Sequence, residues 1–398
     1  MKGETIFCIS TRSWDSPWSE SQKVMSLMQE ANVVYFFNPG RSVHNSVVKE
    51  FVRNFPNFFR LKVEQKAPNL FVVHTPSNLP FGLRHFGRTA LKWIMPMIIR
   101  LNTKILARHM RWVKKKYDIR REILWIFSPY LYLLPGKFHE KLSCYHNYDE
   151  FSDFVGFSHM SDFIDQCDQR LTKAVDFVFS TSLRQTEKRK KINPNTHFVP
   201  NGVDFDLFHQ SMRHEIQLPQ ELVTLPKPII GYTGIMGDHI DVDLLVTIAS
   251  HFKEGSLVLV GPDHIPKSDA YHQLKAMTNV RFLGFKPLQS LPNYIKFFDV
   301  ALIPYRLRGH VLSVYPQKLL EYLSGGKSVV ATTIPALDAY GDVVRVASDY
   351  QEFLRCIVSA LNEKTTEAMI QKRMNVAKEN TWQARINTYY QIIDETLS

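Results

Sequence analysis

The fold of this chain is decided by the stretch Ser313-Val-Tyr-Pro-Gln-Lys-Leu-Leu-Glu-Tyr-Leu-Ser-Gly-Gly-Lys-Ser-Val-Val330. Its first part predicts a helix near residues 317–324, because Pro316 suits the first turn of a helix. The apolar run after it predicts a strand over residues 328–332. A helix that leads directly into an apolar strand is a repeating step of a parallel α/β sheet.

The same alternation extends outward through both halves of the chain. In the second half it predicts a helix from Asp241 and strands over residues 228–232, 257–260, 280–283 and 300–303. In the first half it predicts a helix from Ser19 and strands over residues 5–9, 32–37, 70–74, 123–127, 142–145 and 177–180. The pattern favours two doubly wound units, whose ligands bind at the carboxyl ends of the strands.

Turn residues place the junction between the two units. The polar stretch 184–194 leads into Pro200-Asn201-Gly202, which has strong turn chemistry. We therefore expect a first domain over residues 1–203 and a second over 204–380. Residues 381–398 contain a helix, 382–397, that we expect to cross back to the first domain. A cleft between the domains is the expected binding site.

Composition excludes several protein classes. The 398 residues are 44% hydrophobic and 22% charged, which excludes a disordered, collagen-like or small disulfide-stapled protein. The four cysteines are far apart, so we expect neither a zinc knuckle nor a disulfide framework. Because disulfides are rare in reducing compartments, we expect the protein in the cytoplasm. The longest apolar run, residues 93–99, is interrupted by Pro96 and is too short to span a membrane.

Positive charge is concentrated in residues 84–121. This stretch holds 12 basic residues and one acid, which accounts for the whole net charge of +11. Apolar residues at 94, 98, 101, 105 and 112 alternate with the cations at helical spacing, as in helices that lie on an anionic bilayer. The alternative is a core-packed helix with a solvated basic face. We find no nucleic-acid recognition motif and expect no nucleic acid as partner.

Two motifs of the second half suit a phosphorylated ligand. In Gly231-Tyr-Thr-Gly234-Ile-Met-Gly237 the glycines let the backbone approach a diphosphate, although a simple tight turn explains them too. At the start of the helix near 317, free amides over Ser313 to Gln317 and the ammonium of Lys318 suit phosphate. Glu321, one turn later, suits ribose hydroxyls. The alternative for this lysine and glutamate is a surface ion pair.

Six motifs in order give the chain a family resemblance. They are Asn201-Gly-Val-Asp-Phe-Asp-Leu-Phe208, Gly231-Tyr-Thr-Gly234, residues 257–262, 280–285 and 291–305, and Lys318 to Val330. This series resembles the successive motifs of the GT-B glycosyltransferases, and the match covers nearly the whole chain, most strongly after Pro200. Trp14-Asp15 and the stretch 145–151 are similar to the bacterial envelope-polysaccharide branch of the family-4-like enzymes.

The resemblance implies a function. It implies two Rossmann-like domains that face a central cleft, with an N-terminal acceptor-binding domain and a C-terminal nucleotide-sugar-binding domain. It implies transfer of a sugar from a UDP-linked donor to a lipid-linked or growing envelope glycan. Lys318 suggests a uronic acid as that sugar, because its ammonium can pair with a sugar carboxylate, although it can equally serve phosphate alone. The basic stretch 84–121, read together with a lipid-linked acceptor, predicts that the enzyme is bound at the inner face of the plasma membrane. The donor-site positions that the resemblance implies are Gly234, Met236, Gly261, Phe285, Tyr305, Ser313, Gln317, Lys318 and Glu321.

The sequence departs from the family-4 pattern in two places. Ser313 stands where the paired-glutamate motif has its first acid, and Gly237-Asp238-His239-Ile240 lacks the usual basic residue of the glycine-rich loop. The stereochemistry of transfer therefore stays open. Two other classes also stay open, namely a nucleotide-sugar epimerase of the same fold and a non-catalytic membrane-associated scaffold.

An inverting transfer needs a base from the first domain. Asp149 is our candidate, with His146 as rival and Glu150 next, and the alternative role for Asp149 is to cap the following helix. The pair Asp241-Val-Asp243 looks like a metal-binding motif, but helix capping explains it better. We expect no metal and no cofactor, because positive groups and helix dipoles can stabilise the leaving diphosphate.

Overall fold

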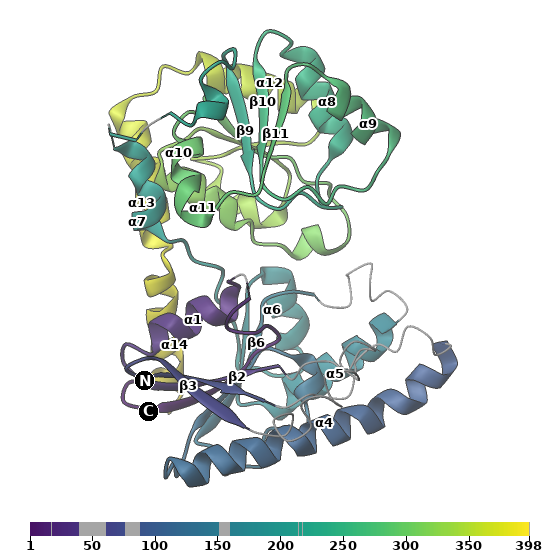
Figure 1. The fold of residues 1–398 in the computed structure, drawn as a ribbon, viewed down its shortest axis with the longest axis vertical. Helices are drawn as coiled ribbons and strands as arrows, with labels where there is room; N and C mark the ends of the chain where they lie inside the picture. The colour runs from purple at the N-terminus through teal and green to yellow at the C-terminus, as the bar shows by residue number, and fades with distance from the viewer. Residues whose placement is uncertain are drawn as a thin grey trace. The chain divides into compact units, whose positions relative to one another are not determined.

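The computed structural model describes residues 1–16, 18–39, 61–75, 88–150, 160–213, 215–216 and 218–397, with only the backbone for residues 88–93, 310 and 313. Residues 84–87 of the basic stretch and Phe151 lie outside this description. The chain divides into two compact units (Figure 1). The first unit consists of Met1–Pro200 and Ile386–Ser398, and the second of Asn201–Arg385.

An eight-stranded sheet forms the centre of the first unit, in the order β3-β4-β2-β1-β5-β6-β7-β8. Its strands are β1 (Thr5–Ile9), β2 (Val33–Asn38), β3 (Lys62–Ala67), β4 (Leu70–His74), β5 (Ile123–Ile126), β6 (Leu142–Asn147), β7 (Phe177–Ser180) and β8 (Thr196–Phe198). All neighbours pair in parallel except β3, which runs antiparallel to β4. Strand order reverses at β1, which pairs with both β2 and β5, so the carboxyl ends of β1 and β5 border the predicted ligand edge.

Helices cover both faces of this sheet. They are α1 (Glu20–Met28), α4 (Arg88–Lys116), α5 (Ser161–Ala174), α6 (Leu183–Lys190) and α14 (Trp382–Leu397), with the 3-10 turn η1 (Pro129–Leu131). On one face, Met110 of α4 and Leu171 of α5 pack against Leu124 and Tyr145. On the other face, Tyr389 of α14 lies edge-on to Phe179, at 4.8 Å between ring centroids. Residues from Ile386 onward therefore help to fill the core of the first unit.

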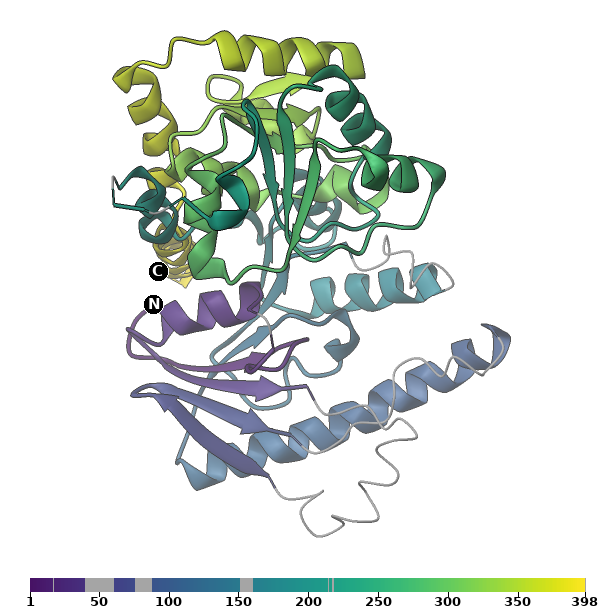
Figure 2. The same ribbon diagram turned by 45° about the horizontal axis from the view of Figure 1, so that its top comes forward.

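The long helix α4 (Figure 2) packs only part of its predicted apolar stripe against the core, and the rest of the stripe is exposed. Of the apolar positions predicted to share a face, Leu101 and Trp112 are exposed while Ile98 is buried. The core takes Met95, Ile99, Ala107, Met110 and Val113 instead. Both sides of this helix carry apolar residues, so periodicity alone could not identify the side that the sheet would cover.

A six-stranded, fully parallel sheet forms the second unit, in the order β11-β10-β9-β12-β13-β14. Its strands are β9 (Ile229–Thr233), β10 (Ser256–Val260), β11 (Val280–Gly284), β12 (Val300–Ile303), β13 (Val329–Thr332) and β14 (Arg345–Ala347). The order reverses between β9 and β12, because β9 pairs with β10 on one side and β12 on the other. The two sheets confirm the predicted doubly wound architecture.

The helices of the second unit follow the expected alternation. They are α7 (Phe205–His209), α8 (Val242–His251), α9 (Asp269–Ala276), α10 (Leu291–Ile295), α11 (Gln317–Ser324), α12 (Tyr350–Asn362) and α13 (Glu367–Glu379). Short 3-10 turns are η4 (Gln210–Met212), η5 (Gln220–Leu222), η6 (Leu288–Ser290), η7 (Gly309–Ser313) and η8 (Pro335–Tyr340). The helix at 317–324 that opened the sequence argument has the predicted bounds.

All four cysteines are free thiols, in agreement with the sequence. Within the described residues, no helix combines the length and the apolar character that a membrane crossing requires.

Candidate functional site

Two glycines bring the first two loops of the second sheet into contact. Gly234 follows β9 and has a φ of +138°, and Gly261 follows β10 and has a φ of +143°. The Gly234 amide donates to the Val260 carbonyl at 2.7 Å. A Cβ added at Gly261 would lie 2.0 Å from the Gly234 carbonyl oxygen. Because neither the φ angles nor the spacing tolerates a side chain, both positions require glycine.

The side chain of Lys318 lies directly over the Gly234 loop. A Cβ added at Gly234 would meet Lys318 Cε at 2.0 Å and Nζ at 2.4 Å. The ammonium is also 5.9 Å from the centroid of the Tyr232 ring. Lys318 belongs to the first turn of α11, so its charge adds to the positive helix end. This edge of the sheet is therefore suited to an anion.

Glu321 is buried one turn further along α11. The helix is tied to the end of β9 by the Tyr322 hydroxyl, which accepts the Thr233 amide at 2.8 Å. Burial raises the pKa of Tyr322, and the negative charge of Glu321 adds to that rise. Burial raises the pKa of Tyr232 as well, with contributions from Tyr305 and Glu321. The charge of Glu321 thus acts on two buried tyrosines, Tyr232 and Tyr322, near the end of β9.

The remaining predicted donor positions differ in what they offer. Met236 is fully buried; its amide donates to the Pro262 carbonyl and its own carbonyl accepts the His264 amide, so it shapes the loop and presents no free polar group. Phe285, just after β11, is 72% exposed. Tyr305 is buried against His239, at 5.0 Å between ring centroids.

The last two predicted positions lie before and at the start of α11. Gln317 is its first residue and is partly buried. Ser313 ends η7, and its side chain lies outside the described part of the structure. The structure therefore brings together Gly234, Gly261 and Lys318, with Tyr305 and Glu321 beside them.

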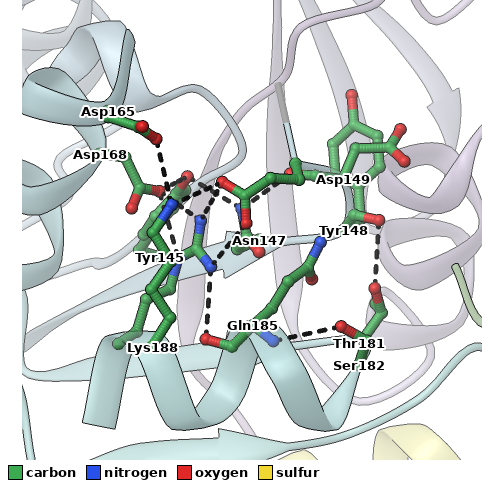
Figure 3. A network of polar contacts seen from close by, with 12 residues as sticks. Tyr145, Asn147, Tyr148, Asp149, Asp165, Asp168, Thr181, Ser182, Gln185 and Lys188 are labelled. Carbon is green, nitrogen blue, oxygen red and sulfur yellow. Dashed lines mark hydrogen bonds and ion pairs between the residues drawn. The ribbon is translucent and has the colours of Figure 1, made fainter. Parts of the chain in front are cut away.

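In the first unit, Asp149 follows the carboxyl end of β6. The Asn147 side chain donates to the Asp149 carbonyl at 3.0 Å and fixes the turn (Figure 3). Burial raises the pKa of the Asp149 carboxyl to about 7; the charges of Glu20 and Glu150 add to this, and Arg12 opposes it. A carboxyl with a pKa near neutrality is suited to exchange protons with a substrate.

His146, the rival base, is completely buried and engaged at both ring nitrogens. The Trp125 indole donates to Nδ1 at 3.2 Å, and Nε2 lies 2.6 Å from a carboxylate oxygen of Glu20. Because an indole N–H can only donate, Nδ1 is the acceptor and Nε2 carries the proton that is donated to Glu20. His146 therefore has no nitrogen available to accept a proton from a substrate.

Glu150 belongs to a buried charge network. Its carboxylate lies 3.1 Å from Lys188 Nζ and 3.4 Å from Arg189. Arg189 is only 1% exposed and also pairs with Asp168 at 2.8 Å, while Lys188 points toward Asp165 at 3.1 Å (Figure 3). The carboxylate of Glu150 is thus held in ion pairs within the fold, which leaves Asp149 as the better candidate.

Sequence reasoning missed Glu20 and Arg12, the two charges that act on Asp149 across the sheet. Glu20 begins α1, and Arg12 follows β1. In the sequence, only the predicted helix from Ser19 pointed to the position of Glu20. The pairing order of β1, β5 and β6, which brings Glu20 and Arg12 toward Asp149, cannot be deduced from one sequence.

Asp241 has the capping role that the sequence favoured, and Asp243 lies in the first turn of the same helix, where its charge suits the helix dipole. Asp241 accepts the Leu244 amide at 3.2 Å as N-cap of α8, and Asp243 lies 3.4 Å from Arg306. Among the described residues, no three His, Cys, Asp or Glu side chains lie close enough together to hold a metal ion.

The two doubly wound sheets, with glycine loops and a lysine–glutamate helix at the edge of the second, define a GT-B fold. Residues 227–363 match the family model for glycosyl transferases group 1, so the second unit contains a domain of that family. The donor-site residues named above all lie within this match.

A curated relative and several solved structures are similar to this chain. The putative teichuronic acid biosynthesis glycosyltransferase TuaH of Bacillus subtilis is 25% identical over 221 residues, which are 53% of this chain and 55% of that protein. The match thus spans about half the length of the curated relative. Sucrose-phosphate synthase from Thermosynechococcus elongatus has a TM-score of 0.67 at 15% identity, with 99% of both chains covered. The trehalose-6-phosphate structure from E. coli bound with UDP-2-fluoro glucose has a TM-score of 0.66 at 11% identity, with 98% of both chains covered.

Proposed function

We propose that this protein is a glycosyltransferase that moves a sugar from a UDP-linked donor to a growing cell-envelope glycan. The observation that carries the proposal is the position of the Lys318 ammonium over the Gly234 loop, with Glu321 one turn away on the same helix. The family match over residues 227–363 supports it.

Each part of a nucleotide diphosphate has a matching group at this edge. The Lys318 ammonium and the amides at the start of α11 suit the diphosphate. The Glu321 carboxylate can accept two hydrogen bonds from ribose hydroxyls. The exposed ring of Phe285 is available to flank the base. The side-chain-free surface at Gly234 and Gly261 allows close approach of the ligand.

The proposed reaction uses Asp149 as base. The acceptor hydroxyl oxygen forms a bond to the anomeric carbon, the bond from that carbon to the diphosphate oxygen breaks, and UDP leaves. The hydroxyl proton passes to the Asp149 carboxylate, whose raised pKa makes it an effective acceptor near neutral pH. Lys318 and the helix dipole stabilise the charge on the leaving diphosphate, so the proposal includes no metal ion and no cofactor.

Substrate details extend the proposal. The relative's printed role in teichuronic acid biosynthesis supports a uronic acid donor, and the Lys318 ammonium is also suited to pair with a sugar carboxylate. We further propose that the acceptor is lipid-linked and that the exposed basic side of α4 holds the protein on the inner face of the plasma membrane.

Calorimetric titration tests the donor site. Wild type and Glu321→Ala are titrated with UDP, UDP-glucose, UDP-N-acetylglucosamine and UDP-glucuronate in metal-free buffer. We expect wild type to bind and Glu321→Ala to lose about 1–3 kcal/mol, as for hydrogen bonds to a charged group. The matched control is Glu379→Ala, at an exposed position in the last turn of α13, which should bind as wild type does.

Two results would contradict the proposal. If wild type binds no uridine nucleotide, the donor is of another class or the protein is a scaffold. If UDP-sugar is consumed and an isomer is returned without release of UDP, the protein is an epimerase.

A further inference from the structure

We propose that a cavity between α4 and the loop after η1 binds the phosphate of an anionic lipid headgroup. Its volume is about 310 Å³, at the small end of the range for ligand pockets. The lining residues are Arg100, Thr103, Lys104, Ala107, Arg111, Leu133 and Lys137. This inference rests on the proposed function in one respect, since it gives the proposed membrane association a defined binding site.

The cavity gathers positive charge with no lining acid. Four of its seven lining residues are cationic, three of them along one stripe of α4 and the fourth, Lys137, from the loop. Within the part of the chain that the structure describes, none of the four forms an ion pair, although Arg111 lies 5.7 Å from the centroid of the Phe138 ring. By contrast, Lys114 on the same helix is paired with the buried carboxylate of Glu122. The cavity therefore has uncompensated charge that an oxyanion would neutralise.

A buried hydroxyl adds to this charge. Thr103 lines the cavity and is almost fully buried, and its Oγ1 has no hydrogen-bond partner among the described residues. Buried polar atoms normally have partners, because an unsatisfied one costs free energy. Oγ1 itself has almost no accessible surface, so a rotation about the Cα–Cβ bond of Thr103 would bring the hydroxyl to a phosphate oxygen in the cavity, which can accept its hydrogen bond. The cavity thus combines electrostatic attraction by its four cations with a hydroxyl group that can donate a hydrogen bond to the phosphate.

Exposed apolar side chains beside the cavity indicate a lipid and not a free phosphate. Met97, Leu101 and Trp112 have exposed fractions of 63%, 44% and 42%. At about 100° per residue, these three positions lie on the strip of α4 that adjoins the cavity stripe. In Figures 1 and 2 this helix runs as one long element beside the strands of the first unit. Apolar contacts on one strip and phosphate-binding groups on the next match the interfacial region of a bilayer.

Vesicle binding tests the site. Wild type is compared on vesicles of phosphatidylcholine alone and mixed with phosphatidylglycerol, and we expect binding only to the mixed vesicles. The variant Lys104→Gln/Arg111→Gln should bind the mixed vesicles about 30-fold more weakly, because each lost positive charge lowers the affinity roughly fivefold and two charges are removed. The control Lys115→Gln/Arg120→Gln removes the same charge from exposed positions outside the cavity, and it should lose clearly less.

A variant that leaves the net charge unchanged distinguishes a defined phosphate site from general electrostatic attraction to an anionic surface. Thr103→Val keeps the shape of the side chain and removes the unpartnered hydroxyl, so the fold should be retained. We expect a several-fold loss of vesicle binding if the hydroxyl contacts phosphate. Equal losses for the two charge variants together with no effect of Thr103→Val would overturn the proposal in favour of diffuse attraction.

Two further measurements complete the test. Titration with inorganic phosphate and pyrophosphate should show weak or no binding; tight binding that the Lys104→Gln/Arg111→Gln change abolishes would make this a site for free phosphate and refute the lipid assignment. The same variant should bind UDP as wild type does. If the variant loses vesicle binding and still binds UDP, the result supports the lipid site and leaves the donor site intact. If wild type fails to bind UDP, the result contradicts the proposed donor site and not the lipid site.

Discussion

Replacing Asp149 with asparagine should stabilise the first unit at alkaline pH. The carboxyl is partly buried beside the negative charges of Glu20 and Glu150, and these surroundings raise its pKa from 3.8 to about 7. A raised pKa in the folded state means that the folded protein holds the proton more tightly than the unfolded chain does. Asp149 therefore contributes stability below pH 3.8 that is lost progressively as the pH rises toward 7.

The size of this effect follows from the two pKa values. A rise from 3.8 to about 7 corresponds to about 4 kcal/mol between the fully protonated and fully ionised limits. Between about pH 5 and about pH 8.5, an interval convenient for experiments, the ionisation of Asp149 should lower the free energy of unfolding of wild type by about 3 kcal/mol. Because Asp149→Asn removes the titration, the stability of the variant relative to wild type should increase by about this amount across the interval.

The assay is urea unfolding at several pH values, followed by tryptophan fluorescence. Five of the six tryptophans belong to the first unit, so the signal reports mainly on the unit that contains Asp149. Asp162→Asn is the matched control, because Asp162 is exposed in the first turn of α5. Its difference from wild type should stay constant with pH. A flat difference for Asp149→Asn, or one that decreases as the pH rises, would show that burial and neighbouring charge do not act on this carboxyl as described.

Three further outcomes are expected. In the transfer assay, kcat/KM should rise with pH through about 7, and Asp149→Asn should lose at least about 100-fold and show no such titration. Gly261→Ala should cost on the order of 3 kcal/mol in thermal unfolding and weaken UDP binding, because its Cβ would lie 2.0 Å from the Gly234 carbonyl oxygen. Arg189→Met should cost about 3–5 kcal/mol in urea unfolding by leaving Asp168 buried without its cation, and adding Asp168→Leu should recover part of that loss.

The strands could be predicted because parallel sheets bury both faces of a strand. Residues 5–9, 70–74, 177–180 and 300–303 are continuous apolar runs, and the structure gives them the predicted bounds. The edge strands β3, β8 and β14 were not predicted. The sequence of β3, Lys-Val-Glu-Gln-Lys-Ala, is mostly polar because an edge strand is partly exposed, so its pattern resembles a loop.

The candidate site could be predicted only where its residues are close in sequence. Lys318 and Glu321 share one helix, and the glycines at 234 and 261 follow strands that the sequence identified. The effect of Glu20 on Asp149 depends on contacts between residues more than 120 positions apart, which a single sequence does not specify. The burial of His146 follows from the same long-range packing.

The packing of helix α14 on the first unit has a consequence for protein synthesis. Ile386, Tyr389 and Ile393 are buried, and Tyr389 packs edge-on against Trp125 and Phe179 in the first unit. A ribosome translates these residues only after the entire second unit. Until they emerge, the nascent first unit must leave an aromatic face of its sheet uncovered. The second unit can thus reach its native state first, although the strands that Tyr389 covers are translated before it.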